Sequence, residues 1–124
     1  MNAPLEDAGY CHCTRCQRRT GGGAEASART REGSFRITRG EDEVKFYRPD
    51  EGSGDAFCSV CGSGLWSPSP DEQTISLRMG SFDTDPGVPI TYRQFVNYAA
   101  PWEPIPDDGI PRYPERRPSQ PKED

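Results

Sequence analysis

Five cysteines in two short clusters constrain this chain more than any other feature of its sequence. Cys11, Cys13 and Cys16 form a C-x-C-x-x-C run, and Cys58 and Cys61 form a C-x-x-C pair followed by glycine. A C-x-x-C turn that ends in glycine is typical of a zinc site, because the turn brings two sulfurs within reach of one ion. An odd number of cysteines also suits metal binding better than a framework of disulfides.

The spacing leaves two arrangements of the cysteines open. Cys13 and Cys16 can join Cys58 and Cys61 in a closed structural site, which would contribute folding energy. Spacing alone favours this arrangement, although it leaves Cys11 unexplained. In the second arrangement the three cysteines of the first cluster hold one ion by themselves and leave its fourth position to water or to a substrate thiol, as in a catalytic zinc site.

The composition favours short strands over long helices. Only 31% of the 124 residues are apolar, and 13 prolines accompany 13 glycines. Such a chain forms one thin-cored domain, for which a structural metal is a common reinforcement. We therefore expect a mostly β fold of five or six short strands.

Alternating apolar and polar residues locate the expected strands. The second cysteine pair should form the turn of a hairpin, with Phe57 in the entering strand and Leu65 and Trp66 in the leaving one. The proline-rich segment from Pro101 should be extended and anchored by a buried Trp102, and Trp66 is expected to be a buried anchor as well. The remaining strands are expected at Ala24–Arg31, Ser34–Arg39, Val44–Arg48, Thr74–Phe82 and Thr91–Tyr98.

The chain ends and the net charge bear on its surroundings. We expect residues 1–9 to be flexible, residues 10–114 to form the domain and residues 115–124 to be disordered. No apolar stretch approaches the roughly 18 to 20 residues that span a bilayer, and nothing resembles a signal peptide. The sequence thus predicts a soluble, cytoplasmic protein without a membrane partner. Its net charge of −5 argues against a nucleic-acid partner.

Positive charge gathers beside the first cysteines, at Arg15, Arg18 and Arg19. These arginines are candidates for binding an anionic substrate, and a solvated loop explains them equally well. Thr20 and the glycines that follow it favour a turn that ends a helix, although their amides can also face an anion. His12 lies between two candidate ligands, so we expect its ring to point away from the ion.

Segments in a fixed order give the chain a recognisable pattern over about residues 10–114. Together they resemble the glutathione-dependent formaldehyde-activating enzyme family, which also includes centromere protein V-like proteins. The specific combination is C-H-C-x-x-C followed by T-G, a later F-C-x-x-C-G, and a terminal A-P-W. The segments are "CHCTRCQRRTGG", "GSFRITRGEDEVKFYR", "FCSVCGSGLW", "MGSFD" and "APWEPIPDDGIPRYP".

The resemblance implies a single Mss4-like domain of short antiparallel strands built around zinc-binding cysteine loops. It also implies a carbon–sulfur lyase-type reaction, in which glutathione adds reversibly to formaldehyde. By this resemblance Cys11, Cys13 and Cys16 hold the catalytic zinc, and Cys58 and Cys61 form half of a separate structural zinc site. Arg15, Arg18 and Arg19 then become candidates for binding a carboxylate of the thiol substrate.

The chain departs from that family near its start. Members usually begin with a strand carrying G-x-C-x-C-G, whose cysteines complete the structural site. The residues before Tyr10 contain no cysteine. We therefore expect a shortened start or a lost half-site, in which Cys58 and Cys61 bind weakly, join the first cluster or hold no metal. The alternative function is a non-catalytic zinc module of Mss4-like fold that binds a protein partner.

Overall fold

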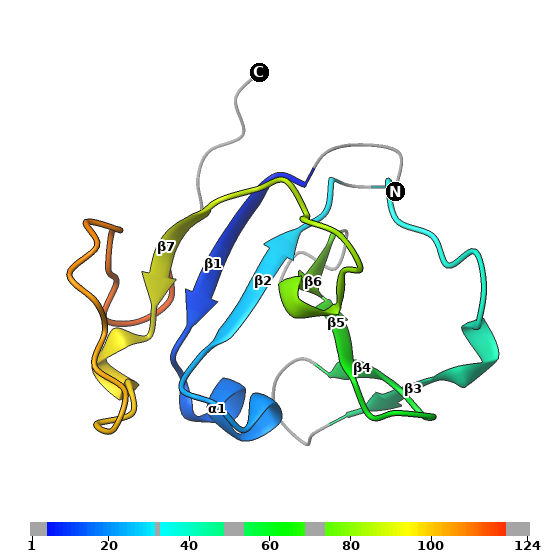
Figure 1. The fold of residues 1–124 in the computed structure, drawn as a ribbon, viewed down its shortest axis with the longest axis horizontal. Coiled ribbons are helices and arrows are strands. Elements are labelled where there is room, and N and C mark those ends of the chain that lie inside the picture. Colours follow the sequence, from blue (N-terminus) through cyan, green and yellow to red (C-terminus); the bar gives the residue numbers. More distant parts are fainter. Residues whose placement is uncertain (1–4, 32, 49–53, 69–73, 119–124) are drawn as a thin grey trace. The chain divides into compact units, whose positions relative to one another are not determined.

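The computed structural model describes residues 5–31, 33–48, 54–68 and 74–118. The chain divides into two compact units, and each is described by itself. Unit 1 comprises Met1–Ala8 and Ala26–Ile90; unit 2 comprises Gly9–Glu25 and Thr91–Asp124. Within the described ranges the chain forms seven strands, one α-helix and three 3-10 helices. This confirms the predicted mostly β fold, with more strands than the five or six expected (Figure 1).

Unit 1 consists of antiparallel strands that follow one another across a sheet. Their order is β3-β4-β5-β6-β2, and each neighbouring pair is antiparallel. A 3-10 helix precedes β3 and another follows β6. The strands are β2 (Glu25–Arg29, whose first residue belongs to unit 2), β3 (Val44–Tyr47), β4 (Asp55–Cys58), β5 (Gly64–Pro68) and β6 (Ile75–Arg78); the 3-10 helices are η1 (Glu41–Glu43) and η2 (Met79–Ser81).

The second cysteine pair forms the turn of the β4–β5 hairpin, as predicted. The amide of Cys58 donates to the carbonyl of Ser63 at 2.9 Å, and the amide of Gly62 donates to the carbonyl of Cys58 at 2.7 Å. Gly62 has φ of +81°, a left-handed conformation that glycine adopts without a steric penalty. The glycine after the pair is therefore required by the turn that brings the two cysteines together.

The core of unit 1 is built from small residues and one buried cation. Its buried apolar residues are alanines and Leu77, in keeping with the low apolar fraction. Arg78 is 8% exposed, and its guanidinium donates to Asp55 and, at 2.9 Å, to Ser67. These partners lie on β4 and β5, so the buried guanidinium links three strands through one ion pair and one hydrogen bond. Trp66 is half-buried and packs against the ring of Phe35, at 5.1 Å between centroids.

Three predicted strands need correction. The segment Ser34–Arg39 forms no strand in the described part of the chain, although Phe35 and Ile37 are half-buried and Arg36 and Thr38 are exposed, as the pattern predicted. The alternation is correct, but a strand also needs a neighbour with which to exchange hydrogen bonds. The segments Thr74–Phe82 and Thr91–Tyr98 form shorter strands that continue as 3-10 helices.

Unit 2 contains the first cysteine cluster. It holds α1 (Thr14–Thr20), β7 (Ile90–Gln94) from Thr91 onward, η3 (Val96–Tyr98) and the second part of β1 (Asp7–Cys11). In this unit β1 lies beside β7. A side chain at Gly9 would overlap the ring of Tyr92, so the glycine allows the ring to lie against the β1 backbone. The start that was expected to be flexible needs correction, because residues 7–9 belong to β1. Residues 1–4 and 119–124 of the expected flexible ends lie outside the described residues.

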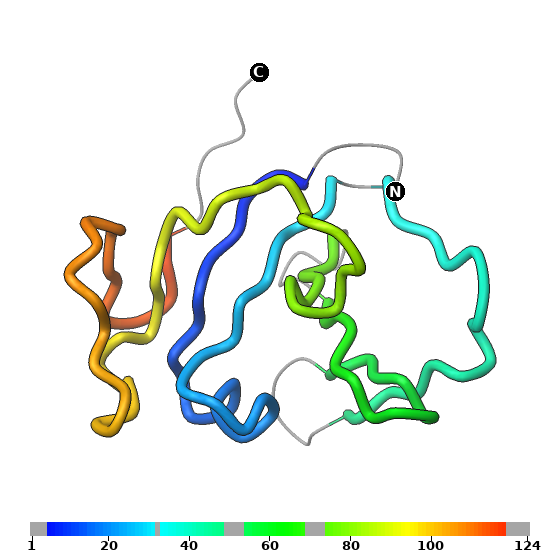
Figure 2. The backbone as a smooth tube through the Cα atoms, in the orientation of Figure 1, coloured from blue at the N-terminus to red at the C-terminus, as the bar shows by residue number. Residues whose placement is uncertain are grey.

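The C-terminal segment of unit 2 folds back along β7 (Figure 2, orange to red). Arg93 donates its amide to the carbonyl of Pro111 at 2.9 Å and accepts from the amide of Tyr113 at 2.8 Å. The two segments run parallel at this point, through a bridge between Arg93 and Arg112. No helix in the described ranges has the length and apolarity to cross a membrane.

We predict that Asp55→Asn lowers the free energy of unfolding by about 3 kcal/mol, because it removes the carboxylate charge that faces the buried guanidinium of Arg78. Urea unfolding followed by circular dichroism measures this change. Asp83→Asn, which removes an exposed carboxylate from the same unit, is the matched control and should change stability by less than about 0.5 kcal/mol. Equal effects of the two substitutions would contradict a structural role for the ion pair.

Candidate metal centre

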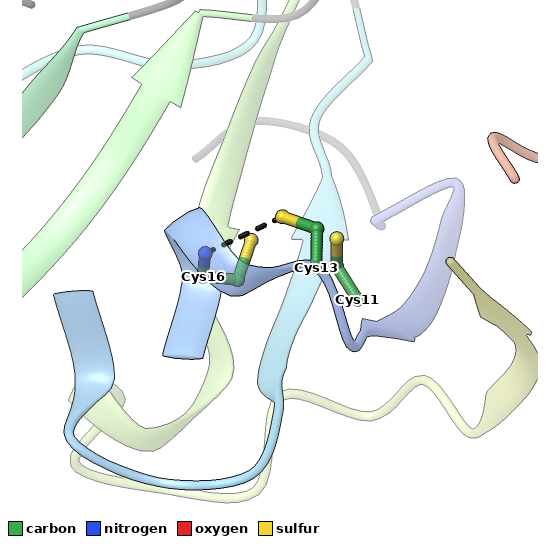
Figure 3. A group of neighbouring side chains, drawn as sticks. All are labelled: Cys11, Cys13 and Cys16. Atoms are coloured by element: carbon green, nitrogen blue, oxygen red, sulfur yellow. Dashed lines mark hydrogen bonds between the residues drawn. The ribbon is translucent and has the colours of Figure 1, made fainter. Parts of the chain in front are cut away.

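Three cysteine sulfurs meet where β1 ends and α1 begins. The Sγ atoms of Cys11, Cys13 and Cys16 all lie within 4.8 Å of one another. In Figure 3 the three side chains come from the end of β1, the loop and the first turn of α1, and their sulfurs face one another. Cys16 is buried, while Cys11 and Cys13 are half-buried. The structure thus brings together the set that the family resemblance implied.

Local geometry explains why this spacing assembles the sulfurs. Cys11 ends an extended strand and Cys13 is still extended, with φ −64° and ψ 156°, so residues two apart project to the same side. Cys13 is the N-cap of α1: its Sγ accepts the amide of Cys16 at 3.3 Å, and its carbonyl accepts the amide of Gln17 at 3.0 Å. The first helical turn therefore brings Cys16 back toward the other two sulfurs.

The three thiols fit a metal ion of the kind that sulfur prefers. A tetrahedral zinc ion with Zn–S bonds of about 2.3 Å requires sulfurs about 3.8 Å apart, and the observed limit of 4.8 Å is compatible with that need. Three protein ligands leave one tetrahedral position for another molecule. Among the described residues, this is the one group of three or more possible ligands that lies close enough to hold an ion.

The protons of the three thiols are shared unequally. Hydrogen bonds from Cys11 and Cys16 lower the pKa of Cys13, and the amide of Cys16 adds to the effect. The hydrogen bond to Cys13, together with burial, raises the pKa of Cys11 to about 11. Hydrogen bonds to Cys11 and Cys13 raise the pKa of Cys16. Of the three thiols, Cys13 is therefore the one that ionises most readily, because two neighbouring thiols and the amide of Cys16 stabilise its thiolate. A divalent cation is what allows all three to ionise together.

The turn after α1 is formed as predicted. Gly21 is the C-cap, with φ of +71°, and its amide donates to the carbonyl of Gln17. The hydroxyl of Thr20 donates to the carbonyl of Cys16 at 2.9 Å and accepts from the amide of Gly22 at 3.1 Å. Thr20 and the glycines thus end the helix immediately after the cysteine turn.

An open hollow lies beside α1. Its volume is about 310 Å³, at the lower end of the range for small-molecule sites. Trp102 lines it and is 66% exposed, so the prediction that this residue is a buried anchor is wrong. The ring of Trp102 is an exposed part of the wall of the hollow. The lining residues are Thr14, Gln17, Arg18, Gly21, Gly22 and Trp102.

The three predicted arginines differ in their surroundings. Arg18 lines the hollow and is exposed. Arg15 is exposed and is not among the lining residues, while Arg19 is half-buried and engaged in an interaction of its own. Gln17 also lines the hollow, and its side chain is held in place because its amide donates to the carbonyls of His12 at 2.8 Å and Tyr98 at 2.9 Å.

His12 is buried and faces a residue that sequence reasoning missed. Its Nε2 lies 3.3 Å from Nη1 of Arg93, whose Nη2 donates to Asp108 at 3.0 Å. Burial, followed by the positive charge of Arg93, lowers the pKa of His12. Nothing in the sequence marks Arg93 or Asp108 as neighbours of the cysteines, because they lie far away in the chain.

Cys58 and Cys61 lie at the tip of their hairpin in unit 1. Cys61 is exposed, and its Sγ lies 3.1 Å from the Oγ of Ser63. That hydrogen bond lowers the pKa of Cys61. Their part in binding a metal stays a prediction, as does the closed site that would join them to Cys13 and Cys16.

Comparisons with known proteins agree with these features. The family model described as "Glutathione-dependent formaldehyde-activating enzyme" matches residues 1–98. The crystal structure of a Rhodobacter sphaeroides protein, a structural genomics target, has the same fold, with a TM-score of 0.53 and 20% identity. That match covers 89% of this chain and 88% of the other. The search of curated proteins finds no significant match.

We predict that Cys13 is the first of the three clustered thiols to be alkylated in the reduced, chelator-treated chain. A thiol with a lowered pKa is ionised to a larger extent at pH 7, whereas Cys11, with a pKa of about 11, is almost entirely protonated. The rate at Cys11 should rise with pH through the alkaline range, while that at Cys13 stays nearly constant above neutrality. Peptide mass spectrometry after brief treatment with iodoacetamide measures both rates, and faster labelling of Cys11 would contradict the assignment.

Proposed function

This chain belongs to the glutathione-dependent formaldehyde-activating enzyme family, and from that premise we propose that it is a zinc-dependent carbon–sulfur lyase. In the synthetic direction it would add the thiol of glutathione to formaldehyde, and in the reverse direction it would release both. The observation that carries the proposal is the group of three cysteine sulfurs within 4.8 Å of one another. A three-thiol set suits a reacting metal because it leaves one position for a substrate.

The reaction requires no electron transfer. The sulfur of glutathione forms a bond to the carbonyl carbon, the C=O π pair moves onto oxygen, and the proton that leaves sulfur is balanced by one that oxygen gains. The product is S-hydroxymethylglutathione, and all atoms of both substrates are retained. The main catalytic requirement is a thiolate at neutral pH, since the thiolate is the nucleophile.

Cys11, Cys13 and Cys16 would hold the zinc ion through their three sulfurs. A zinc ion in this position supplies Lewis acidity, which lowers the pKa of a thiol bound beside it. The chain's own contribution is to fix the three sulfurs on one short turn. The amide of Cys16 donates to the Sγ of Cys13 and stabilises its negative charge.

The hollow beside α1 is the proposed place for the rest of the thiol substrate. One of its lining residues, Thr14, directly follows the candidate ligand Cys13 in the sequence. Arg18, another lining residue, lies one helical turn after Thr14 on the same side of α1. Glutathione carries two carboxylates, and the guanidinium of Arg18 can bind one of them through two parallel hydrogen bonds. Arg15 and Arg19 would add positive potential around this site, which favours an anionic substrate.

We predict that the zinc-loaded chain forms the adduct from glutathione and formaldehyde faster than the spontaneous reaction. Chelation of the metal, or Cys11→Ser, should abolish the acceleration because the site loses its ion or one of its sulfur ligands. The measurement is the rate of adduct formation followed by proton NMR at neutral pH, with zinc restored to the chelated sample as the control. No acceleration by the metal-replete chain would favour the alternative, a non-catalytic zinc module that binds a protein partner.

We predict that Arg18→Gln raises the KM for glutathione about tenfold and leaves kcat nearly unchanged. A charge-assisted hydrogen bond contributes about 1.5 kcal/mol, which corresponds to roughly a tenfold change in binding. Arg36→Gln, which removes one exposed arginine from unit 1, is the matched control and should leave both constants unchanged. An equal effect of the two substitutions would show that only net charge matters and would remove Arg18 from the site.

A further inference from the structure

Arg93 is a buried cation at the centre of a cluster next to the cysteine turn. It is 8% exposed, yet it carries a charge whose burial is costly unless that charge is compensated. Its Nη2 donates to the carboxylate of Asp108 at 3.0 Å, and its guanidinium carbon lies 4.5 Å from the centroid of the Tyr10 ring. Its Nη1 also lies 3.3 Å from the Nε2 of His12. In the sequence, His12 stands directly between Cys11 and Cys13.

The chemistry of these groups fixes the proton on His12. An arginine side chain has donors and no acceptor, so the Nε2 of His12 must be the acceptor in this contact. An Nε2 that accepts carries no proton, so the ring is neutral and its proton is on Nδ1.

The partner of Arg93 is itself held in place. The Oδ1 of Asp108 accepts the amide of Ile110 at 3.1 Å, which leaves Oδ2 for the guanidinium. The backbone of Arg93 exchanges hydrogen bonds with Pro111 and Tyr113, so the segment from Asp108 to Tyr113 is aligned with β7. This segment lies beyond the residues that match the family model. It is therefore a part of this chain that supports the cysteine turn from outside the matched region.

We propose that Arg93 is a positioning residue that, held by Asp108, donates to the Nε2 of His12, holds the ring in its Nδ1–H tautomer and thereby fixes the Cys11–His12–Cys13 segment. The ring of His12 is then neither a ligand through Nε2 nor a proton donor at that atom. This inference rests on the proposed function in one respect: it assumes that the clustered cysteines bind the metal. A cation that served only to pair with Asp108 would not need a contact with His12.

The first test uses the full chain without substitution. His12 is the sole histidine of the sequence, so a long-range ¹H–¹⁵N NMR spectrum contains signals from one imidazole ring. We expect a single neutral tautomer at neutral pH, with Nδ1 protonated and Nε2 unprotonated, in the metal-free and in the zinc-loaded chain. A spectrum with Nε2 protonated, or with an exchanging mixture of tautomers, would overturn the proposal.

The second test asks whether the lock acts on the metal site. Arg93→Gln and Asp108→Asn should each give a mixture of His12 tautomers, and Arg93→Gln should weaken zinc binding by about 10- to 100-fold, as is usual for groups that orient ligands. Asp107→Asn removes the same charge from the neighbouring exposed residue and should change neither quantity. Zinc affinity is measured by chelator competition. A folded Arg93→Gln chain with one tautomer and unchanged affinity would overturn the proposal.

The two tests separate this inference from the proposed function. If Arg93→Gln does not fold, Asp108→Asn and the tautomer of the unsubstituted chain decide the question. In one outcome the unsubstituted chain shows the expected tautomer, and Arg93→Gln weakens zinc binding, but the chain does not accelerate the glutathione reaction. That outcome would support the positioning role of Arg93 and refute the lyase. Acceleration that persists in a folded Arg93→Gln chain with unchanged zinc affinity would support the lyase and refute Arg93.

Discussion

The candidate site depends on one turn of six residues that gathers three sulfurs. Its central member, Cys13, is at once a possible metal ligand and the N-cap of α1, because its Sγ accepts the amide of Cys16. This double role couples the helix to the site: a hydrogen bond that begins the helix also orients a sulfur. Loss of the helix would move Cys16 away, and a protonated Cys13 would be a poorer acceptor for the helix amide. A single hydrogen bond thus both starts the helix and orients a candidate ligand.

The thin interior explains why such a chain would gain from a metal. Alanine dominates the buried apolar residues, and the largest fully buried side chain among the described residues is that of Thr30. In unit 2 the buried apolar residues are Cys16 and Ala100. A methyl group buries little surface, so burial of these residues supplies little hydrophobic stabilisation. Buried ionic contacts at Arg78 and Arg93 specify how segments meet, but ion pairs of this kind add little net free energy. Metal–sulfur bonds supply stabilisation that does not depend on apolar area.

How much could be predicted from the sequence depends on the range of the interaction. The glycines that end α1 and the β4–β5 hairpin are encoded within a few residues, and both are observed as expected. The grouping of Cys11, Cys13 and Cys16 was implied by the family resemblance, whereas spacing alone favoured a closed site with Cys58 and Cys61. The segment Ser34–Arg39 has the alternation of a strand but lacks ladder bonds in the described structure, because pairing depends on residues elsewhere. The exposed Trp102 shows that the burial of a large aromatic residue cannot be predicted from its residue type alone. The contact between His12 and Arg93 joins residues 81 positions apart, and no local pattern records it.

Local positive charge would reconcile this acidic protein with the acidic substrate that we propose. Three thiolates around a divalent cation carry one negative charge in excess, and the chain as a whole carries −5. A thiol peptide with two carboxylates would be repelled by such a surface unless positive charge were placed locally. The arginines of α1 provide that charge on the solvent side, with Arg18 at the hollow, while Arg93 provides it from the buried side next to His12. Because the Nε2 of His12 faces Arg93, the product oxygen of the proposed reaction would gain its proton from water rather than from this atom.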